Sequence, residues 1–199
     1  MDQVIIDFLL TRRSSKPALL SEPGPEANQL TTILLAAARV PDHKKLVPWR
    51  FIVFEGEARR RFGERLAEIC QTGEGLNSSP GVPSEPSDIR LDTERGRLLR
   101  APTVICVVSS PRTDVPVPEI EQILSAGAVC FNLCLAANAL GFGTSWITEW
   151  YAFSDKVSQT LGLSKKERIA GFIYLGTESE KQPDRDRPQL EDIVTRWDG

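Results

Sequence analysis

Residues 120–140 form the longest apolar segment of this 199-residue chain. They predict a helix that is apolar nearly all round, so it must be buried on more than one side. Small residues from 125 to 128 would let another helix approach closely. In a soluble chain of this size, such a helix is central either to the fold or to a dimer interface.

The composition excludes several classes of function. A net charge of −3 gives no bulk attraction to nucleic acid or acidic membranes, so we expect neither as a partner. The apolar stretch at residues 4–10 is too short to span a bilayer. Four scattered cysteines, no signal peptide and one histidine favour a reducing cytoplasm and no metal site. We interpret Cys130 and Cys134 as small buried hydrophobes in preference to a redox pair or metal clip.

Hydrophobic patterns predict an alternation of helices and strands that fits one domain spanning residues 1–199. Helices are expected at 3–10, 30–37, 57–69, 92–99 and 154–161, and strands at 50–54, 103–108, 144–148 and 169–176. Residues from about 71 to 90 are rich in Gly, Ser and Pro, which predicts a flexible loop. Because strands of one apparent core lie on both sides, we favour an insertion that covers a site over a domain linker. A C-terminal arm is expected from about residue 177.

Two basic segments are candidate anion sites. Arg12, Arg13 and Ser14 end the first expected helix, where two guanidiniums and a hydroxyl could bind a phosphate. Basic residues also suit a helix C-terminus, and from the sequence alone that interpretation is favoured. The second segment, which includes His43, is a basic turn between a helix end and a core strand. Its rigid neighbours would hold its side chains still.

A glycine-rich segment follows the long helix and reads Gly-Phe-Gly-Thr-Ser-Trp over residues 141–146. It is not a dinucleotide-binding fingerprint, because it lacks the third glycine and ends a helix rather than beginning one. It can be a glycine C-cap with a turn into a strand. Alternatively, its glycines have no side chains, which lets a flat ring lie against main-chain amides.

In this order, the segments resemble those of the nitroreductase family of flavin enzymes. The matching segments are Arg-Arg-Ser at 12–14, Pro-Asp-His-Lys at 41–44 with Pro-Trp-Arg-Phe at 48–51, the 141–146 segment, and Gly-Phe-Ile-Tyr-Leu-Gly at 171–176 followed by arginines. The resemblance is closest to a small subgroup that carries Pro-Asp-His-Lys. It covers most of the chain, and the ordered set is more specific than any single segment.

The resemblance implies an α+β fold, in which helices flank a mixed, mostly antiparallel sheet, and an obligate homodimer with FMN at its interface. It also implies an FMN-dependent NAD(P)H oxidoreductase. The enzyme would take hydride from NADH or NADPH and reduce nitroaromatics, quinones or similar small-molecule acceptors by a ping-pong mechanism. The cofactor would carry the chemistry, without a catalytic side chain. Alternatives are another flavin-dependent dehydrogenase on this fold, or a flavin-binding sensor or storage protein without efficient turnover.

The site residues are likewise implied by the resemblance. Arg12, Arg13 and Ser14 would contact the FMN phosphate and ring, and the 144–146 segment would approach the flavin through its backbone. Arg39 and His43 would reach FMN bound mainly to the other subunit, although His43 can also be a water-exposed turn residue. The full set is Arg12, Arg13, Ser14, Arg39, His43, Thr144, Ser145, Trp146, Arg185 and Arg187.

Two features leave the composition of the binding site partly undetermined. Arg185 and Arg187 are alternative candidates to complete the phosphate site, and their segment can equally be a solvated arm. Val47 stands where the family usually has a glutamine whose amide reaches the flavin, and Lys45 stands where it often has asparagine. Valine cannot donate that hydrogen bond, so one polar contact to the cofactor is missing.

Overall fold

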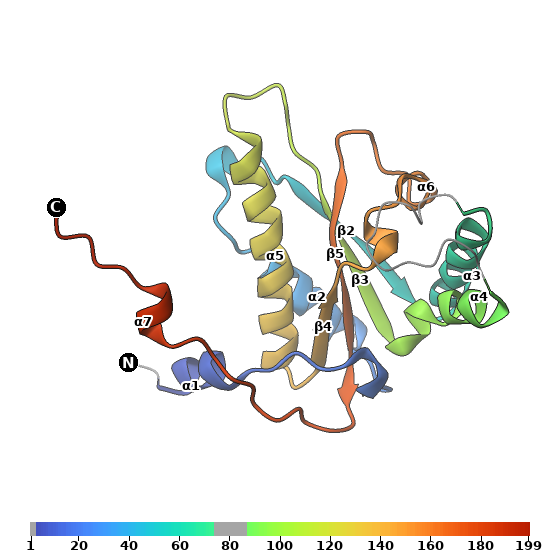
Figure 1. Cartoon of the computed structure of the whole chain (residues 1–199), viewed down its shortest axis with the longest axis horizontal. Helices are drawn as coiled ribbons and strands as arrows, with labels where there is room; N and C mark the ends of the chain where they lie inside the picture. The colour runs from blue at the N-terminus through green and yellow to red at the C-terminus, as the bar shows by residue number, and fades with distance from the viewer. Residues whose placement is uncertain (1–2, 74–86) are drawn as a thin grey trace.

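The computed structural model describes residues 3–73 and 87–199, and a five-stranded sheet lies at its centre (Figure 1). Its strands are β1 (Leu20–Ser21), β2 (Trp49–Glu55), β3 (Thr103–Ser109), β4 (Gly143–Ile147) and β5 (Arg168–Glu178). β2 pairs with β3, and β5 pairs with β3, β4 and β1. All four pairings are antiparallel. The α+β expectation is confirmed.

Helices cover both faces of this sheet. α2 (Ala27–Ala37) and α5 (Glu119–Ala139) lie on one face, and α3 (Glu57–Gln71), α4 (Asp88–Arg95) and α6 (Asp155–Thr160) lie toward the other (Figure 1). Among the described residues, α5 is the one helix long and apolar enough to cross a membrane, by length and composition alone. In the structure it packs against β3, β4, β5 and α2, as a core helix does.

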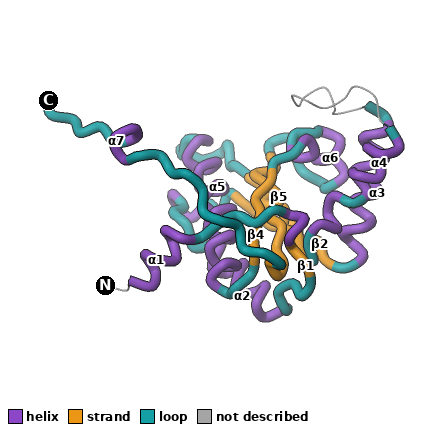
Figure 2. The backbone as a smooth tube through the Cα atoms, turned by 60° about the horizontal axis from the view of Figure 1, so that its bottom comes forward, coloured by secondary structure: helices purple, strands orange, loops and turns teal. Residues whose placement is uncertain are grey.

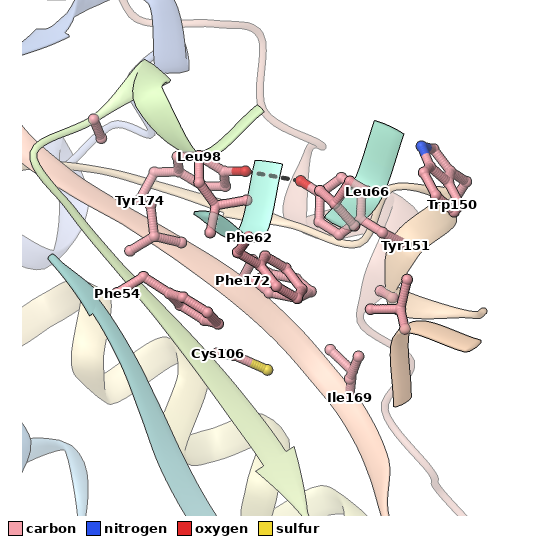
Figure 3. Close-up of a cluster of buried hydrophobic side chains, with 14 of the residues drawn as sticks. Phe54, Phe62, Leu66, Leu98, Cys106, Trp150, Tyr151, Ile169, Phe172 and Tyr174 are labelled. Carbon is pink, nitrogen blue, oxygen red and sulfur yellow. Dashed lines mark hydrogen bonds between the residues drawn. The ribbon is translucent and has the colours of Figure 1, made fainter. Parts of the chain in front are cut away.

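Strand alternation divides the interior into two cores. In β3, Val104 and Cys106 point into the core under α3, whereas Ile105 points into the core under α5. We call the first the aromatic core, because Phe54, Phe62, Tyr151, Phe172 and Tyr174 fill it (Figure 3). We call the second the α5 core, which contains Ile33, Ile105, Val129, Leu133 and Ile173. Every residue of β3 is buried, as a central strand requires.

The expected elements are found with small shifts at their ends. The helix expected at 120–140 is α5, and the helix expected at 92–99 is α4 followed by a 3₁₀ turn at Arg97–Arg100. The flexible loop expected to end near residue 90 ends earlier, because the Ser87 side chain accepts a bond from Arg90 N and caps α4. Residues 74–86 of that expected loop lie outside the described residues.

Two segments extend away from the body. α1 (Gln3–Thr11) and the C-terminal arm both project from the body near the foot of α5 and diverge toward their ends (Figures 1 and 2). The arm begins after Glu178, slightly later than expected, and contains the short helix α7 (Leu190–Ile193). Neither α1 nor α7 has a buried residue, although both are rich in apolar side chains.

Candidate functional site

A basic pocket lies where α1, the foot of α5 and the end of β5 meet. Its volume is about 310 Å³, and it is lined by Phe8, Thr11, Arg12, Arg13, Asn138, Gly141, Phe142, Gly143, Glu178, Lys181 and Gln182. Three cationic side chains face one carboxylate there, so the pocket suits an anion. We call this the cationic pocket.

Three lining residues bury a polar atom for which the described part of the chain offers no hydrogen-bond partner. These atoms are Arg12 Nε, Asn138 Oδ1 and Glu178 Oε1. Buried polar groups in folded proteins are nearly always paired, because an unpaired one costs about 1–3 kcal/mol. Because three such atoms surround one pocket, we treat it as a candidate site for a polar ligand.

Arg12 and Arg13 are adjacent but differently held. Arg12 Nη2 donates to Ser14 Oγ at 3.3 Å, and its guanidinium lies 5.8 Å from the ring centroid of Phe131 on α5. Arg13 Nε instead donates to the Pro183 carbonyl at 2.9 Å, and its side chain lies 4.0 Å from the Asp184 carboxylate. Arg12 is thus the better ligand candidate, while Arg13 ties the C-terminal arm to the end of α1.

The segment after Arg13 runs directly beside β4. Ser15 N donates to the Thr144 carbonyl at 2.8 Å, which brings two of the expected site segments together. Close approach requires glycine at 143, since a Cβ there would lie 2.6 Å from Ser15 Oγ. Thr144 and Ser145 are themselves buried, so neither presents an open surface in the single chain.

Trp146 is the exposed member of the β4 segment. Its Nε1 donates to the Ala170 carbonyl at 3.2 Å, and 42% of its surface remains exposed. The indole fills the space above Gly171, where a Cβ would lie 2.0 Å from Nε1. Gly171 therefore lets the indole approach the backbone of β5 closely.

Trp146 also borders a second, mostly apolar pocket of about 570 Å³. The pocket lies between α5 and β5 and is lined by Ser109, Pro111, Glu119, Ile123, Leu124, Gly127, Ala128, Trp146, Arg168, Ile169 and Ala170. An apolar wall with few polar groups suits a flat, hydrophobic ring. We call this the apolar pocket.

Arg39 and His43 lie on an exposed turn along one side of α5. His43 Nδ1 is 2.7 Å from Glu121 Oε2, and Arg39 accepts a bond at its carbonyl from Asn132 Nδ2 at 3.3 Å. Neither residue lines the cationic pocket of the same chain. Their placement fits the expectation that they serve a second subunit's site, and that role stays a prediction.

Val47, which stands at the family's glutamine position, has an unusual backbone. Its φ is +49°, and Lys44 and Lys45 also have positive φ. A β-branched residue with positive φ is strained, and such strain gathers at functional sites. Both oxygens of Asp42 hold the turn by accepting from Leu46 N at 3.0 Å and Val47 N at 2.9 Å.

Arg185 and Arg187 lie on the exposed arm and do not line the cationic pocket. Arg187 Nη2 instead donates to Asp184 Oδ1 at 3.0 Å. The basic residue that does line the pocket after β5 is Lys181, which sequence reasoning missed. The sequence marks Lys181 only as the first basic residue after the expected strand, which does not place it beside α1.

The cysteines of α5 behave as small apolar residues. Cys130 and Cys134 are buried and free. Burial raises the pKa of the Cys134 thiol to about 11, although a hydrogen bond with Thr144 and the charge of Arg12 oppose this. The thiol is therefore protonated at neutral pH.

Comparisons with known proteins agree with this geometry. The sequence model of the Nitroreductase family matches residues 9–177. A protein of Escherichia coli K12 named "Putative NAD(P)H nitroreductase YdjA" is 36% identical over 172 residues, which are 86% of this chain and 87% of that protein. A Haemophilus influenzae protein with the same enzyme description is 34% identical over 177 residues, covering 88% and 89% of the two chains.

Solved structures share the fold. A nitroreductase-like family protein from Bacillus cereus superposes with a TM-score of 0.76 at 22% identity, covering 98% of this chain and 96% of that one. A Desulfovibrio desulfuricans protein described as a nitroreductase in complex with FMN has a TM-score of 0.70 at 19% identity, covering 98% of both chains. With the family match spanning most of its residues, the chain belongs to the nitroreductase family.

Proposed function

We propose that this protein is an FMN-dependent NAD(P)H oxidoreductase that works as a homodimer. It reduces nitroaromatics, quinones or similar small acceptors by ping-pong hydride transfer. Family membership supports the enzyme class, and a similar fold is described in complex with FMN. We further propose that residues 1–199 act as one domain and that the protein works in the cytoplasm.

The observation that carries this proposal is the set of unpaired buried atoms in the cationic pocket. Arg12 Nε and Asn138 Oδ1 supply a donor and an acceptor, and Arg13 and Lys181 add positive charge. The FMN phosphate needs donors and cations of this kind. The Glu178 carboxylate opposes an anion, so we place it toward hydroxyl groups of the ligand, from which it can accept.

The ring end of the cofactor has a matching surface. We place the flavin ring along β4, where Thr144 and Ser145 are buried and Trp146 lies partly exposed over Gly171. Bound FMN supplies the hydride chemistry. The protein holds the phosphate with its cations, orients the ring against β4 and excludes water with the apolar pocket.

The dimer is supported by apolar surface that one chain leaves uncovered. On α5, Ile120, Ile123, Leu124 and Phe131 are exposed at helical spacing i, i+3, i+4, i+11. α1 and α7 add further exposed apolar side chains on segments that project from the body (Figure 2). A second copy would cover this surface and bring a second Arg39 and His43 toward the flavin.

Visible absorption of the purified protein tests the proposal. We expect a yellow protein whose flavin band bleaches when NADH or NADPH is added without oxygen and returns when a quinone is added. A yellow protein that does not bleach would support the sensor or storage alternative. A colourless protein that also does not bind added FMN would refute flavin binding altogether.

A further inference from the structure

Glu121, near the start of α5, contacts the candidate site residue His43 but is not itself among the expected site residues. Its Oε2 lies 2.7 Å from His43 Nδ1, and the two side chains are 46% and 52% exposed. An ionised carboxylate accepts hydrogen bonds and cannot donate them, so the contact requires a proton on Nδ1. This leaves Nε2 as the free nitrogen of the ring.

The same side of α5 holds the backbone that leads into His43. Ser125 Oγ donates to the Pro41 carbonyl at 2.5 Å, and Asn132 Nδ2 donates to the Ala36 carbonyl at 2.5 Å. Residues 121, 125 and 132 are spaced i, i+4 and i+11, which places them on one face of a helix. We call these three residues the polar edge of α5.

The far side of the turn is fixed independently. The Asp42 carboxylate accepts from Leu46 N and Val47 N, and the strained backbone at Lys44 and Lys45 follows. The backbone of His43 is therefore held from both directions, and its ring has one described partner, Glu121. A turn fixed to this degree suggests that the direction of the imidazole matters.

We propose that Glu121 is a positioning residue that fixes the tautomer and direction of His43, so that Nε2 faces FMN held mainly by the second protomer. This inference rests on the proposed function. Histidines that bind metal ions are commonly oriented by a carboxylate on the other ring nitrogen, and His43 and Glu121 have the same arrangement. An ordinary surface ion pair would instead contribute little to stability and nothing to cofactor binding.

The chain has a single histidine, so its imidazole gives an unambiguous NMR signal. Side-chain nitrogen shifts of the full-length protein would report the tautomer in the wild type, Glu121→Ala and Glu121→Gln. We expect Nδ1–H in the wild type and in Glu121→Gln, whose amide oxygen still accepts. We expect the proton to leave Nδ1 in Glu121→Ala. An unchanged tautomer in Glu121→Ala would overturn the inference.

Fluorescence titration with FMN provides the second readout. At metal sites, loss of the partner that orients a histidine weakens binding about 10- to 100-fold; by analogy we expect FMN binding to weaken on the order of tenfold in Glu121→Ala but not in Glu121→Gln. In a His43→Ala background, Glu121→Ala should add nothing, because Glu121 acts through the imidazole. Glu68→Ala is the matched control, since Glu68 forms an exposed 2.6 Å ion pair with Arg65 on α3.

The outcomes separate this inference from the proposed function. If the wild type binds FMN and Glu121→Ala binds it equally well, the positioning role is wrong and the flavin assignment stands. The positioning role is also wrong if Glu121→Ala weakens FMN binding equally with and without His43. If the wild type and the Glu68→Ala control both fail to bind FMN, the proposed function fails and this inference fails with it.

Discussion

The two faces of the sheet differ in how completely one chain covers them. On the aromatic side, even a fully buried carboxylate has several partners. Glu94 is fully buried, yet it contacts Arg90 at 2.7 Å, Arg97 at 2.9 Å and the indole nitrogen of Trp150 at 3.0 Å. Arg100 donates to the Tyr174 hydroxyl at 3.0 Å, and that hydroxyl meets Tyr151 at 2.8 Å (Figure 3).

The α5 side has small residues inside and large apolar residues outside. Ala126, Cys130 and Ala137 bring the helix close to the sheet, while Leu124 and Phe131 face outward without cover. The candidate flavin residues also gather along this helix or at its foot. From this difference we infer that the aromatic side is completed within one chain, and we propose that the flavin site lies on the side that a second copy would cover.

The largest effect is expected from Phe172→Ala, in the middle of the aromatic core. Phe172 is fully buried and its ring centroid lies 4.8 Å from that of Tyr151. The cavity should lower the free energy of unfolding by about 3–5 kcal/mol, measured by urea denaturation. Phe153→Ala, at an exposed position toward the same side, should cost well under 1 kcal/mol. Equal costs would contradict the contrast between the two faces.

The second-largest effect is expected at the proposed dimer surface on α5. Leu124→Asp places a charge on the outward face of α5, where Leu124 is 64% exposed in the single chain. Two such charges meeting at an interface should raise the dimer dissociation constant on the order of 100-fold, measured by analytical ultracentrifugation. Ile89→Asp, on α4 and 81% exposed, is the control and should remain dimeric. Dissociation of both variants, or of neither, would show that α5 is not the interface.

Substitution of Arg12 and Arg13 tests whether the cationic pocket, on the α5 side, binds FMN. A charge-assisted hydrogen bond contributes about 1.5–3 kcal/mol, so Arg12→Ala should weaken FMN binding roughly 10- to 100-fold. Arg13→Ala should weaken it less, because that guanidinium is engaged by Pro183 and Asp184. Arg65→Ala on α3 should leave the FMN dissociation constant unchanged. A larger loss in Arg13→Ala than in Arg12→Ala would reverse our assignment.

The smallest effect concerns acid stability. Arg50 binds Glu167 through two hydrogen bonds, of 2.6 and 3.2 Å, and this pairing lowers the pKa of Glu167 from 4.5 to about 2. Because the folded-state pKa is depressed, the stabilisation is present above about pH 4.5 and is lost as the pH falls toward 2.

Glu167→Gln tests that pairing. After allowance for the partial exposure of Arg50, it should lower the free energy of unfolding by about 1 kcal/mol at pH 7. The difference from the wild type should shrink below pH 4.5, as urea denaturation at several pH values would show. A difference that stays constant down to pH 2 would mean that the charge of Glu167 is not responsible.

Much of the fold could be predicted from the sequence, because its main elements carry strong local patterns. The uninterrupted apolar run of α5 and the β-branched run of β3 each permit few alternatives. The two-residue strand β1 is too short to carry such a pattern. Leu20 and Ser21 form a strand only because the end of β5 extends beyond β3 and β4 and offers them a partner. Helix α4 begins earlier than expected because the cap at Ser87 lies within a stretch whose composition indicated a loop.

The site was predictable as a set of segments but not as an arrangement of side chains. Arg12 and Arg13 look equivalent in sequence, and only the returning arm makes them different. Lys181 was missed because its position beside α1 depends on where β5 ends. Glu121 gave no signal, since an acidic residue in the first turn of a helix is already explained by the helix dipole.

The position of β5 at the hub of the sheet has a consequence for how the chain is made. It is the last strand to be synthesised, yet β1, β3 and β4 all pair with it. Until β5 leaves the ribosome, β2 and β3 are the only described strands that can form their native pairing. The emerging chain therefore exposes unpaired strand edges and the apolar α5 until β5 is available. A product truncated before β5 should be a substrate for chaperones and proteases.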